Sequence, residues 1–208
     1  MAEDAILNQP PAIDSGRREL RAVLRSRRQS LGAAQRIAAA EAIVGWLQRH
    51  PAFTQPGYVA GYWASGGELP LHALQLKLRP DQSWCLPCVQ PDGRLKFAPW
   101  RAGDPLVSNR FGIPEPDLDP ASLLDPETMG LVLLPLLGFA RDGGRLGMGG
   151  GYYDRSFAFR RERRAPPELI GVGYGFQEIE PFAGATWDVP LDAVVTELEL
   201  IHCERAKP

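Results

Sequence analysis

The residues best suited to chemistry lie in one glycine-rich segment, 145–155, with the sequence RLGMGGGYYDR. Four glycines fall within residues 147–151. Because glycine has no side chain, its backbone N–H groups can come close to an anion. Arg145 and Arg155 place positive charge at the two ends, and Asp154 adds a carboxylate that can hold a divalent cation. These residue types together predict a site that handles phosphate groups.

The spacing within this segment differs from two well-known phosphate loops. No Gly-Lys-Ser/Thr follows the glycines, which excludes a Walker loop. No acidic residue stands on a second strand at the distance that a dinucleotide fingerprint requires. The loop chemistry alone therefore leaves nucleotide binding and a plain glycine-rich turn as alternatives.

The elements that must position this loop can be read from the apolar pattern. Residues 131–137 form an apolar run typical of a buried strand, and residues 156–164 are expected to form the helix after the loop. Near the start of the chain, 17–29 is expected to be a helix with Arg17, Arg21, Arg25 and Arg28 on one face and Leu20, Val23 and Leu24 on the buried face.

Further strands and helices alternate along the chain. Strands are expected at 58–63, 83–89, 95–100, 169–175 and 192–197, with a Pro-Asp-Gly turn joining the second and third, and a proline-rich ordered loop at 104–125. Such alternation predicts an α/β fold, a three-layer Rossmann-like sandwich with a largely parallel, mixed central sheet. We expect a single domain over 17–208 and a flexible N-terminal extension over 1–16.

The string RLGMGGGYYDR closely resembles the signature of the 5-formyltetrahydrofolate cyclo-ligase family, also called methenyltetrahydrofolate synthetases. Four other segments agree with that family in order and spacing, and the resemblance covers about 17–197. They are RRELR at 17–21, WASGGE at 63–68, FGIPEP at 111–116 and WDVPLD at 187–192. The resemblance implies an ATP-dependent ligase that acts on reduced folate.

The resemblance also implies roles for individual residues. Arg145 and Tyr152 are the expected catalytic residues. The implied ATP-binding residues are Arg17, Arg18, Glu19, Leu20, Arg21, Arg145, Leu146, Gly147, Met148, Gly149, Gly150, Gly151, Tyr152 and Tyr153.

Folate and metal sites are implied in the same way. Glu68 is expected to accept the paired N–H donors of the pterin ring, Trp63 to offer it a flat surface, and Tyr152 to stand between nucleotide and folate. Asp154 and Asp188 are the expected ligands of Mg²⁺, and Asp192 is the alternative to the second of them.

Three positions depart from the family pattern. Leu69-Pro70-Leu71 follows Glu68 where relatives often have acidic or hydroxyl residues. Ala140 stands where an aspartate is common, with Asp142 nearby, and Met148 stands where a basic residue is common. Ala140 and the Leu69-Pro70 departure keep open another ATP-dependent ligase or kinase on the same scaffold. The arginine clusters at 17–28 and 160–164 keep open a non-catalytic relative that binds nucleotide or RNA.

Composition excludes several other classes of protein. A net charge of −2 gives no general attraction to nucleic acid or acidic membranes, so neither is an expected partner. No apolar run reaches transmembrane length, and the acidic N-terminus does not resemble a signal peptide. Three cysteines make no disulfide framework, and the Cys85/Cys88 pair is expected to be structural. The sequence favours a cytoplasmic enzyme, expected to be a monomer, whose partners are ATP and a reduced folate that can carry a polyglutamate tail.

Overall fold

A seven-stranded sheet forms the centre of the protein in the computed structural model, which describes residues 12–182 and 184–204. The strand order is β11-β10-β9-β6-β1-β2-β3. The five inner strands are parallel, and β3 and β11 pair antiparallel with them at the two edges. Their bounds are β1 Gly57–Ala60, β2 Gln82–Val89, β3 Leu95–Pro99, β6 Met129–Pro135, β9 Glu168–Val172, β10 Ala193–Val195 and β11 Leu200–His202. The predicted α/β fold with a largely parallel, mixed sheet is confirmed.

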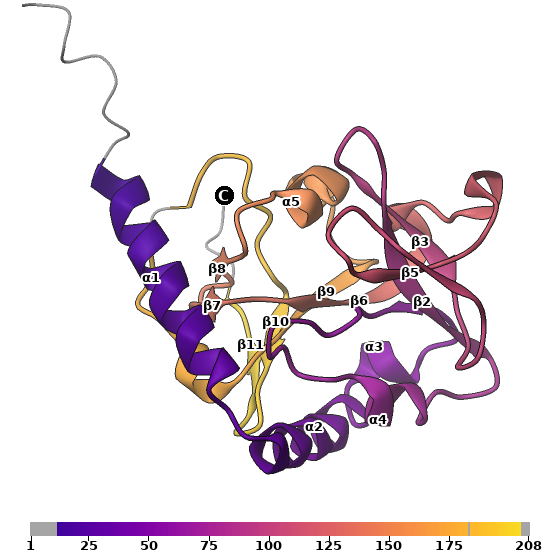
Figure 1. Ribbon diagram of the computed structural model, residues 1–208, viewed down its shortest axis with the longest axis horizontal. Helices are drawn as coiled ribbons and strands as arrows, with labels where there is room; N and C mark the ends of the chain where they lie inside the picture. Colours follow the sequence, from indigo (N-terminus) through magenta and orange to yellow (C-terminus); the bar gives the residue numbers. More distant parts are fainter. Residues whose placement is uncertain (1–11, 183, 205–208) are drawn as a thin grey trace, which may run out of the picture.

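Helices cover both faces of this sheet because its central strands are apolar on both sides. In β6, Leu131 and Leu133 pack in one core cluster, and Val132 and Leu134 pack in another. Figure 1 shows α2, α3 and α4 below the sheet and α5 above it. The bounds are α2 Ala33–Leu47, α3 Pro51–Thr54, α4 His72–Gln75 and α5 Tyr152–Ser156. The three expected layers are therefore present.

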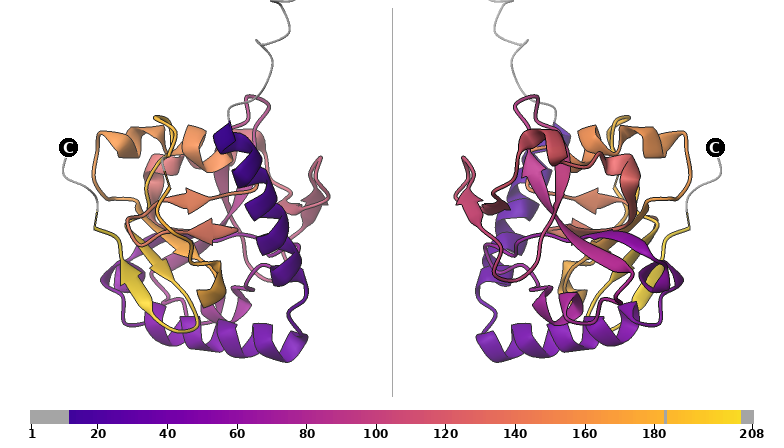
Figure 2. Two further views of the ribbon diagram at one scale, coloured as in Figure 1. Left: turned by 90° about the vertical axis from the view of Figure 1, so that its left-hand side faces the viewer. Right: turned by 90° about the vertical axis from the view of Figure 1, so that its right-hand side faces the viewer.

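Helix α1 (Ala12–Gln29) stands apart from these two layers, at the side of the molecule that faces the viewer in the left panel of Figure 2. It starts before the expected Arg17, so residues 12–16 belong to the helix and not to an extension. Residues 1–11 lie outside the described part of the chain. Leu24 is buried as expected, but Val23 is 63% exposed, which corrects the predicted buried face.

The segments around the glycine loop differ from the expectation. A small hairpin, β7 (Gly138–Phe139) with β8 (Arg145–Leu146), separates β6 from the loop. The helix expected over 156–164 is wrong: α5 ends at Ser156, and a 3-10 turn, η3 (Ala158–Arg161), follows. Within η3, Arg160 is fully buried and donates to Asp192, so contacts distant in sequence hold this segment.

The proline-rich segment 104–125 is ordered, as expected, but contains structure of its own. Its hairpin consists of β4 (Leu106–Ser108) and β5 (Pro114–Pro116), and a 3-10 turn, η1 (Pro120–Ser122), follows. Two more 3-10 turns, η2 (Pro126–Thr128) and η4 (Gly175–Gln177), lie before β6 and after β9. The predicted hairpin of 83–89 with 95–100 is confirmed as β2 and β3.

Cys85 and Cys88 are both buried in β2. Burial raises the pKa of each thiol to about 12, so both are neutral at physiological pH and poor nucleophiles or metal ligands. This supports the structural role that the sequence predicts. None of the helices in the described ranges is both long and apolar enough to cross a membrane.

A buried histidine makes the stability of this fold dependent on pH. His50 is 4% exposed, its Nδ1 has no hydrogen-bond partner, and its Nε2 lies 3.3 Å from Glu168 Oε1. Burial, and secondarily the stacked His202, lowers the pKa of His50 below its usual value. The unfolded chain therefore takes up the proton first as pH falls below about 6.5, which stabilises the unfolded state.

We expect the contribution of His50 to the free energy of unfolding to decrease between about pH 7 and pH 5, so the free energy of unfolding of His50→Gln should fall less over this range than that of wild type. Urea denaturation of both proteins at several pH values measures this difference. His72→Gln, at an exposed position, is the control. Parallel curves for wild type and His50→Gln would show that His50 does not cause the slope.

Candidate active site

The principal cavity lies at the carboxyl ends of the parallel strands β1, β2 and β6 and has a volume of about 660 Å³. β1 and β6 are neighbours in the sheet, but the chain continues from β1 to one side and from β6 to the other. In α/β sheets, ligands bind in the crevice outside such a switch point. The cavity is lined by the loop after β1, the start of the β6–β7 connection, the glycine loop and the segment around Asp188. Residues of α1, of β2 and β3 and of the β4–β5 hairpin line it too.

The glycine loop, residues 147–151, borders this cavity. Gly149 and Gly151 have φ of +96° and +65°, a conformation that favours glycine. No atom lies within 4 Å of a Cβ built on Gly147 or Gly149, whereas one on Gly150 would meet the Tyr152 ring and one on Gly151 would meet Arg155. The backbone is therefore open to a ligand at Gly147 and Gly149.

Two arginines hold the loop in this shape through its carbonyl groups. Arg21 Nε of α1 donates to Gly147 O at 3.0 Å. Arg155 Nη2 donates to Gly150 O at 2.7 Å, and its Nε donates to Gly93 O at 2.9 Å in the β2–β3 turn. Arg155 is exposed and lies outside the cavity lining, so it braces the loop from behind and does not face the expected anion.

The family resemblance implies that ATP binds here, and we then expect Gly149→Ala to raise the KM for ATP about tenfold, because a Cβ at φ +96° strains the backbone and moves the loop amides. KM for the reduced folate that the resemblance also implies should change little. Gly103→Ala is a matched control, since Gly103 has φ +101°, equally open surroundings and a position outside the cavity. Steady-state kinetics of both variants measure the effect. Equal ATP KM values in the two would contradict this role of the loop.

Behind the loop, the predicted catalytic Arg145 is bonded to the predicted metal ligand Asp154. The Arg145 side chain is 8% exposed, and its guanidinium donates to Asp154 Oδ1 and to Val189 O. Val189 N donates to the same Asp154 oxygen at 3.0 Å. This network joins α5 to the segment that carries Asp188.

Asp154 and Asp188 consequently line the same cavity. Asp188 Oδ2 accepts a hydrogen bond from Ala185 N at 2.8 Å. The alternative ligand, Asp192, instead accepts two bonds from the buried Arg160, at 2.9 and 2.7 Å, and one from Leu169 N, and it lies outside the cavity lining. The geometry favours Asp188 over Asp192.

Of the residues expected to bind ATP from α1, Arg17 and Arg21 line the cavity. The Arg17 guanidinium lies 4.9 Å from the ring centre of Phe182. Arg18 and Glu19 are exposed, Leu20 is partly buried, and all three lie outside the cavity lining. The structure thus brings two of these five residues to the cavity.

Both tyrosines of the glycine-rich segment also line the cavity. Tyr152 makes an edge contact with Phe111, with ring centres 5.8 Å apart, and its hydroxyl accepts a bond from Arg110 Nη2 at 2.9 Å. Tyr153 stacks on Phe157, and burial raises its pKa, so its hydroxyl stays protonated. Arg110 and Phe182 were not among the residues expected at the site.

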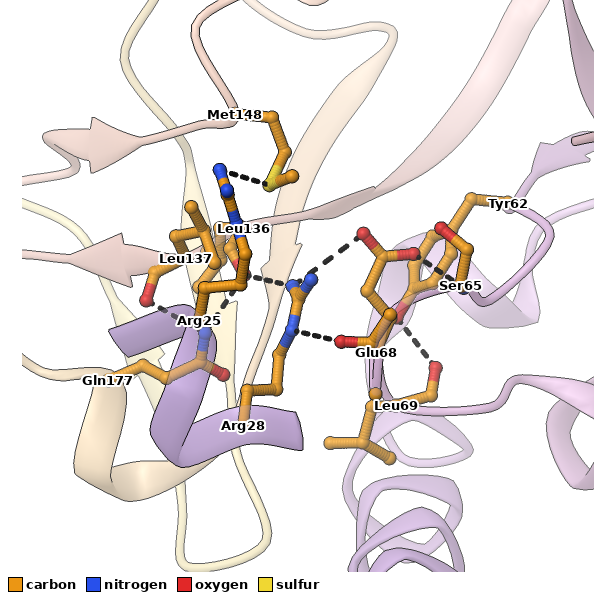
Figure 3. A network of polar contacts seen from close by, with 12 residues as sticks. Arg25, Arg28, Tyr62, Ser65, Glu68, Leu69, Leu136, Leu137, Met148 and Gln177 are labelled. Carbon is orange, nitrogen blue, oxygen red and sulfur yellow. Dashed lines mark hydrogen bonds and ion pairs between the residues drawn. The ribbon is translucent and has the colours of Figure 1, made fainter. Parts of the chain in front are cut away.

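Trp63 and Glu68, on the loop after β1, form another part of the cavity wall. Trp63 is held by edge contacts with His72 and Trp100, with ring centres 6.1 and 5.8 Å apart. Glu68 Oε2 accepts a bond from Ser65 N at 3.0 Å, and Oε1 lies 3.6 Å from Arg28 Nη1 (Figure 3). Burial raises the pKa of Glu68, while the Ser65 bond and Arg28 act in the opposite direction.

Two of the departures from the family pattern lie away from the cavity. Ala140 is fully buried, and Asp142 is exposed in the β7–β8 turn, where it accepts a bond from Gly144 N. Leu69 and Leu71 are buried in the core below the sheet. Met148, the third departure, lines the cavity and is 56% exposed.

Comparisons with known proteins identify the family of this chain. The family model for the 5-formyltetrahydrofolate cyclo-ligase family matches residues 13–197. The chain is 32% identical over 177 residues to 5-formyltetrahydrofolate cyclo-ligase of Escherichia coli K12, which covers 84% of this chain and 96% of that protein. The enzyme of the same name from Haemophilus influenzae is 30% identical over 178 residues, or 84% of this chain and 94% of that protein.

A solved structure has the same fold. The NMR structure of Aquifex aeolicus 5,10-methenyltetrahydrofolate synthetase superimposes with a TM-score of 0.76 and 27% identity, covering 92% of this chain and 95% of that one. The family match spans most of the sequence, including every segment that lines the cavity. The chain belongs to the 5-formyltetrahydrofolate cyclo-ligase family.

Proposed function

We propose that this protein converts 5-formyltetrahydrofolate to 5,10-methenyltetrahydrofolate, with ATP converted to ADP and phosphate. The observation that carries this proposal is one cavity with two unlike walls. The glycine loop with Arg17 and Arg21 forms the wall suited to phosphates, and Trp63 with Glu68 forms the wall suited to a pterin ring. A phosphoryl donor and a folate can thus meet without leaving the site.

The chemical difficulty of this reaction is that the oxygen of an N-formyl group is a poor leaving group. Transfer of the terminal phosphoryl group of ATP to that oxygen makes it a good one and releases ADP. The N10 nitrogen of the folate then attacks the formyl carbon, the C–O bond breaks, phosphate leaves with both bonding electrons, and N10 loses its proton. Such a transfer depends on positioning and on neutralising charge.

The residues of the phosphate wall can neutralise the charge of the transferred phosphoryl group. Arg17 and Arg21 supply fixed positive charge from α1, and the open backbone of the glycine loop supplies N–H donors. We infer that Arg145 neutralises phosphate charge where it borders the cavity, while it also positions Asp154. α5 has only one short turn, so the loop amides, and not a helix dipole, must carry the anion binding.

The residues of the folate wall can position the folate for this transfer. The ionised Glu68 can accept the paired N–H donors of the pterin, and Trp63 offers a flat surface for its ring. Tyr152 also lines the cavity, with its hydroxyl held by Arg110 and its ring held by Phe111. We infer that it separates the nucleotide from the folate and excludes water from the reacting atoms.

Asp154 and Asp188 fit the requirements of Mg²⁺. Magnesium is commonly held by one or two carboxylates together with substrate phosphates, and it keeps several waters. Both carboxylates line the cavity, and the described residues contain no cluster of three or more histidine, cysteine or acidic side chains that would form a closed metal cage. When bound, the ion would neutralise charge on the phosphates of ATP.

The alternatives receive less support from the structure. An RNA-binding relative was suggested by the arginine clusters at 17–28 and 160–164, but Arg17 and Arg21 line the cavity and Arg28 and Arg160 are buried. A different ligase or kinase was suggested by the departures at Ala140 and at 69–71. Ala140, Leu69 and Leu71 are buried and lie outside the cavity lining, so these departures do not change the cavity wall.

One assay tests the proposal. Purified protein with ATP, magnesium and 5-formyltetrahydrofolate is expected to produce the ultraviolet absorbance of the methenyl product. Omitting ATP is the control and should abolish the signal. ATP turnover with another acid or amide, combined with none on folate, would replace this function by the alternative ligase.

A further inference from the structure

A buried arginine stands directly behind the folate wall. Arg28 lies in the last turn of α1 and is 2% exposed. Its guanidinium donates from Nε to Gly66 O at 3.1 Å and from Nη1 to Leu136 O at 3.2 Å, and Nη1 lies 3.6 Å from Glu68 Oε1 (Figure 3). Arg28 lies outside the cavity lining, whereas Glu68 borders the cavity. Any effect of Arg28 on a ligand must therefore pass through its partners.

These partners connect three parts of the site. Gly66 and Glu68 belong to the loop after β1, and Leu136 directly follows β6, so Arg28 joins the two strands that form the switch point. Gln177 Nε2 donates to Leu136 O from the opposite side at 2.9 Å. A point charge such as lysine cannot make this set of contacts, since the guanidinium presents several donors in one rigid fork.

The loop around Glu68 is also held from other elements. Tyr174 donates its hydroxyl proton to Gly67 O at 3.2 Å, and Tyr62 donates to Leu69 O at 2.8 Å. Burial raises the pKa of Tyr62, Tyr153 and Tyr174, the three tyrosines that interact electrostatically with Glu68, so they stay neutral. The cation paired with Glu68 among the described residues is Arg28.

The charge of Glu68 is decisive for a pterin. An ionised carboxylate offers acceptors to two N–H donors, whereas a protonated one carries a donor of its own. Glu68 has an 11% exposed side chain, and the loss of water favours its neutral form. Arg28 and Ser65 N favour the ionised form. The 3.6 Å separation from Arg28 is longer than a hydrogen bond, which leaves acceptor capacity on Oε1.

We propose that Arg28 is a positioning residue for folate, which keeps the Glu68 carboxylate ionised and fixed against the cavity. This role rests on the proposed function and extends it to a residue that does not itself touch the substrate. Removing the cation should weaken folate binding, leave ATP binding little changed and move the acid limb of the pH profile toward neutral pH.

The test compares Arg28→Gln and Arg28→Lys with wild type. In Arg28→Gln we expect KM for 5-formyltetrahydrofolate to rise roughly tenfold or more, a smaller change in kcat and an unchanged KM for ATP. The acid limb of kcat/KM for folate should move to higher pH, because Glu68 loses the cation that favours its charged form. Arg28→Lys should restore most of the pH profile but only part of the affinity.

Controls separate this role from a general loss of structure. Arg27→Gln changes the neighbouring exposed arginine, which lies over Phe176, and should leave folate KM and the pH profile unchanged. In a Glu68→Gln background, Arg28→Gln should add little to the folate KM, because its action passes through Glu68. Melting temperatures and equilibrium folate binding, followed by tryptophan fluorescence, are recorded for every variant.

The outcomes distinguish the two proposals. If the wild type is active and Arg28→Gln has an unaltered folate KM and pH profile, the proposed role of Arg28 is overturned while the proposed function stands. Equal rises in the KM of folate and ATP, or fully additive effects with Glu68→Gln, would also overturn it and indicate a merely structural arginine. Wild type that neither binds folate nor forms the methenyl product would overturn the proposed function and this inference together.

Discussion

Asp154→Asn is expected to lower kcat by about a thousandfold or more while the protein stays folded. Asparagine keeps the size of the side chain and an oxygen that can accept from Val189 N, so the link to the Asp188 segment can persist. The negative charge that would hold Mg²⁺ and that pairs with Arg145 is lost. Turnover at saturating ATP, measured across a magnesium titration, should show both a lower plateau and a higher magnesium requirement.

Asp142→Asn is the matched control for this experiment. Asp142 is exposed in the β7–β8 turn, bonds Gly144 N and lies outside the cavity lining. Its replacement should leave kcat and the magnesium dependence unchanged. An Asp154→Asn protein with full activity would remove the metal assignment, and one with a collapsed melting temperature would show that the Arg145 pair serves the fold instead.

Glu68→Gln is expected to raise KM for 5-formyltetrahydrofolate by about a hundredfold with little change in KM for ATP. The amide replaces one acceptor oxygen by an NH₂ donor, which opposes one of the pterin N–H groups. The substitution also leaves the guanidinium of Arg28 buried without its anionic partner, so the melting temperature should fall. Steady-state kinetics and thermal denaturation separate the two consequences.

Glu178→Gln provides the comparison for Glu68→Gln. Glu178 forms an exposed ion pair with Arg141, at 2.7 Å, and lies outside the cavity lining, so its loss should affect neither KM value. A Glu68→Gln enzyme with unchanged folate KM would show that another residue recognises the pterin. A rise in ATP KM of the same size would place Glu68 on the nucleotide side of the cavity.

Local signals in the sequence predicted several elements correctly. Most of the expected strand 131–137 lies in β6, which spans Met129–Pro135, because consecutive apolar residues suit a strand covered on both faces. The β2–β3 hairpin follows from its Pro-Asp-Gly turn, and the open glycine loop from the absence of side chains. Such features depend on neighbouring residues alone, which is why a linear pattern reveals them.

Local signals failed where the surroundings decided the outcome. The pattern over 156–164 suits a helix, but the chain there forms only a 3-10 turn, with the fully buried Arg160 bonded to Asp192 across the fold. Val23 is apolar and on the expected face, yet α1 packs so that it is 63% exposed. Both results depend on partners far away in the sequence.

The sequence by itself therefore determined the fold class, the family and the segments that build the site, because their residue types are fitted to backbone shape and to phosphate or pterin chemistry. Only the tertiary structure decided which arginines contribute to the site. Arg17 and Arg21 border the cavity, Arg155 braces the loop from outside, and Arg28 is buried behind Glu68. All are the same residue type, and what distinguishes them is burial and the distant groups that their guanidinium donors reach.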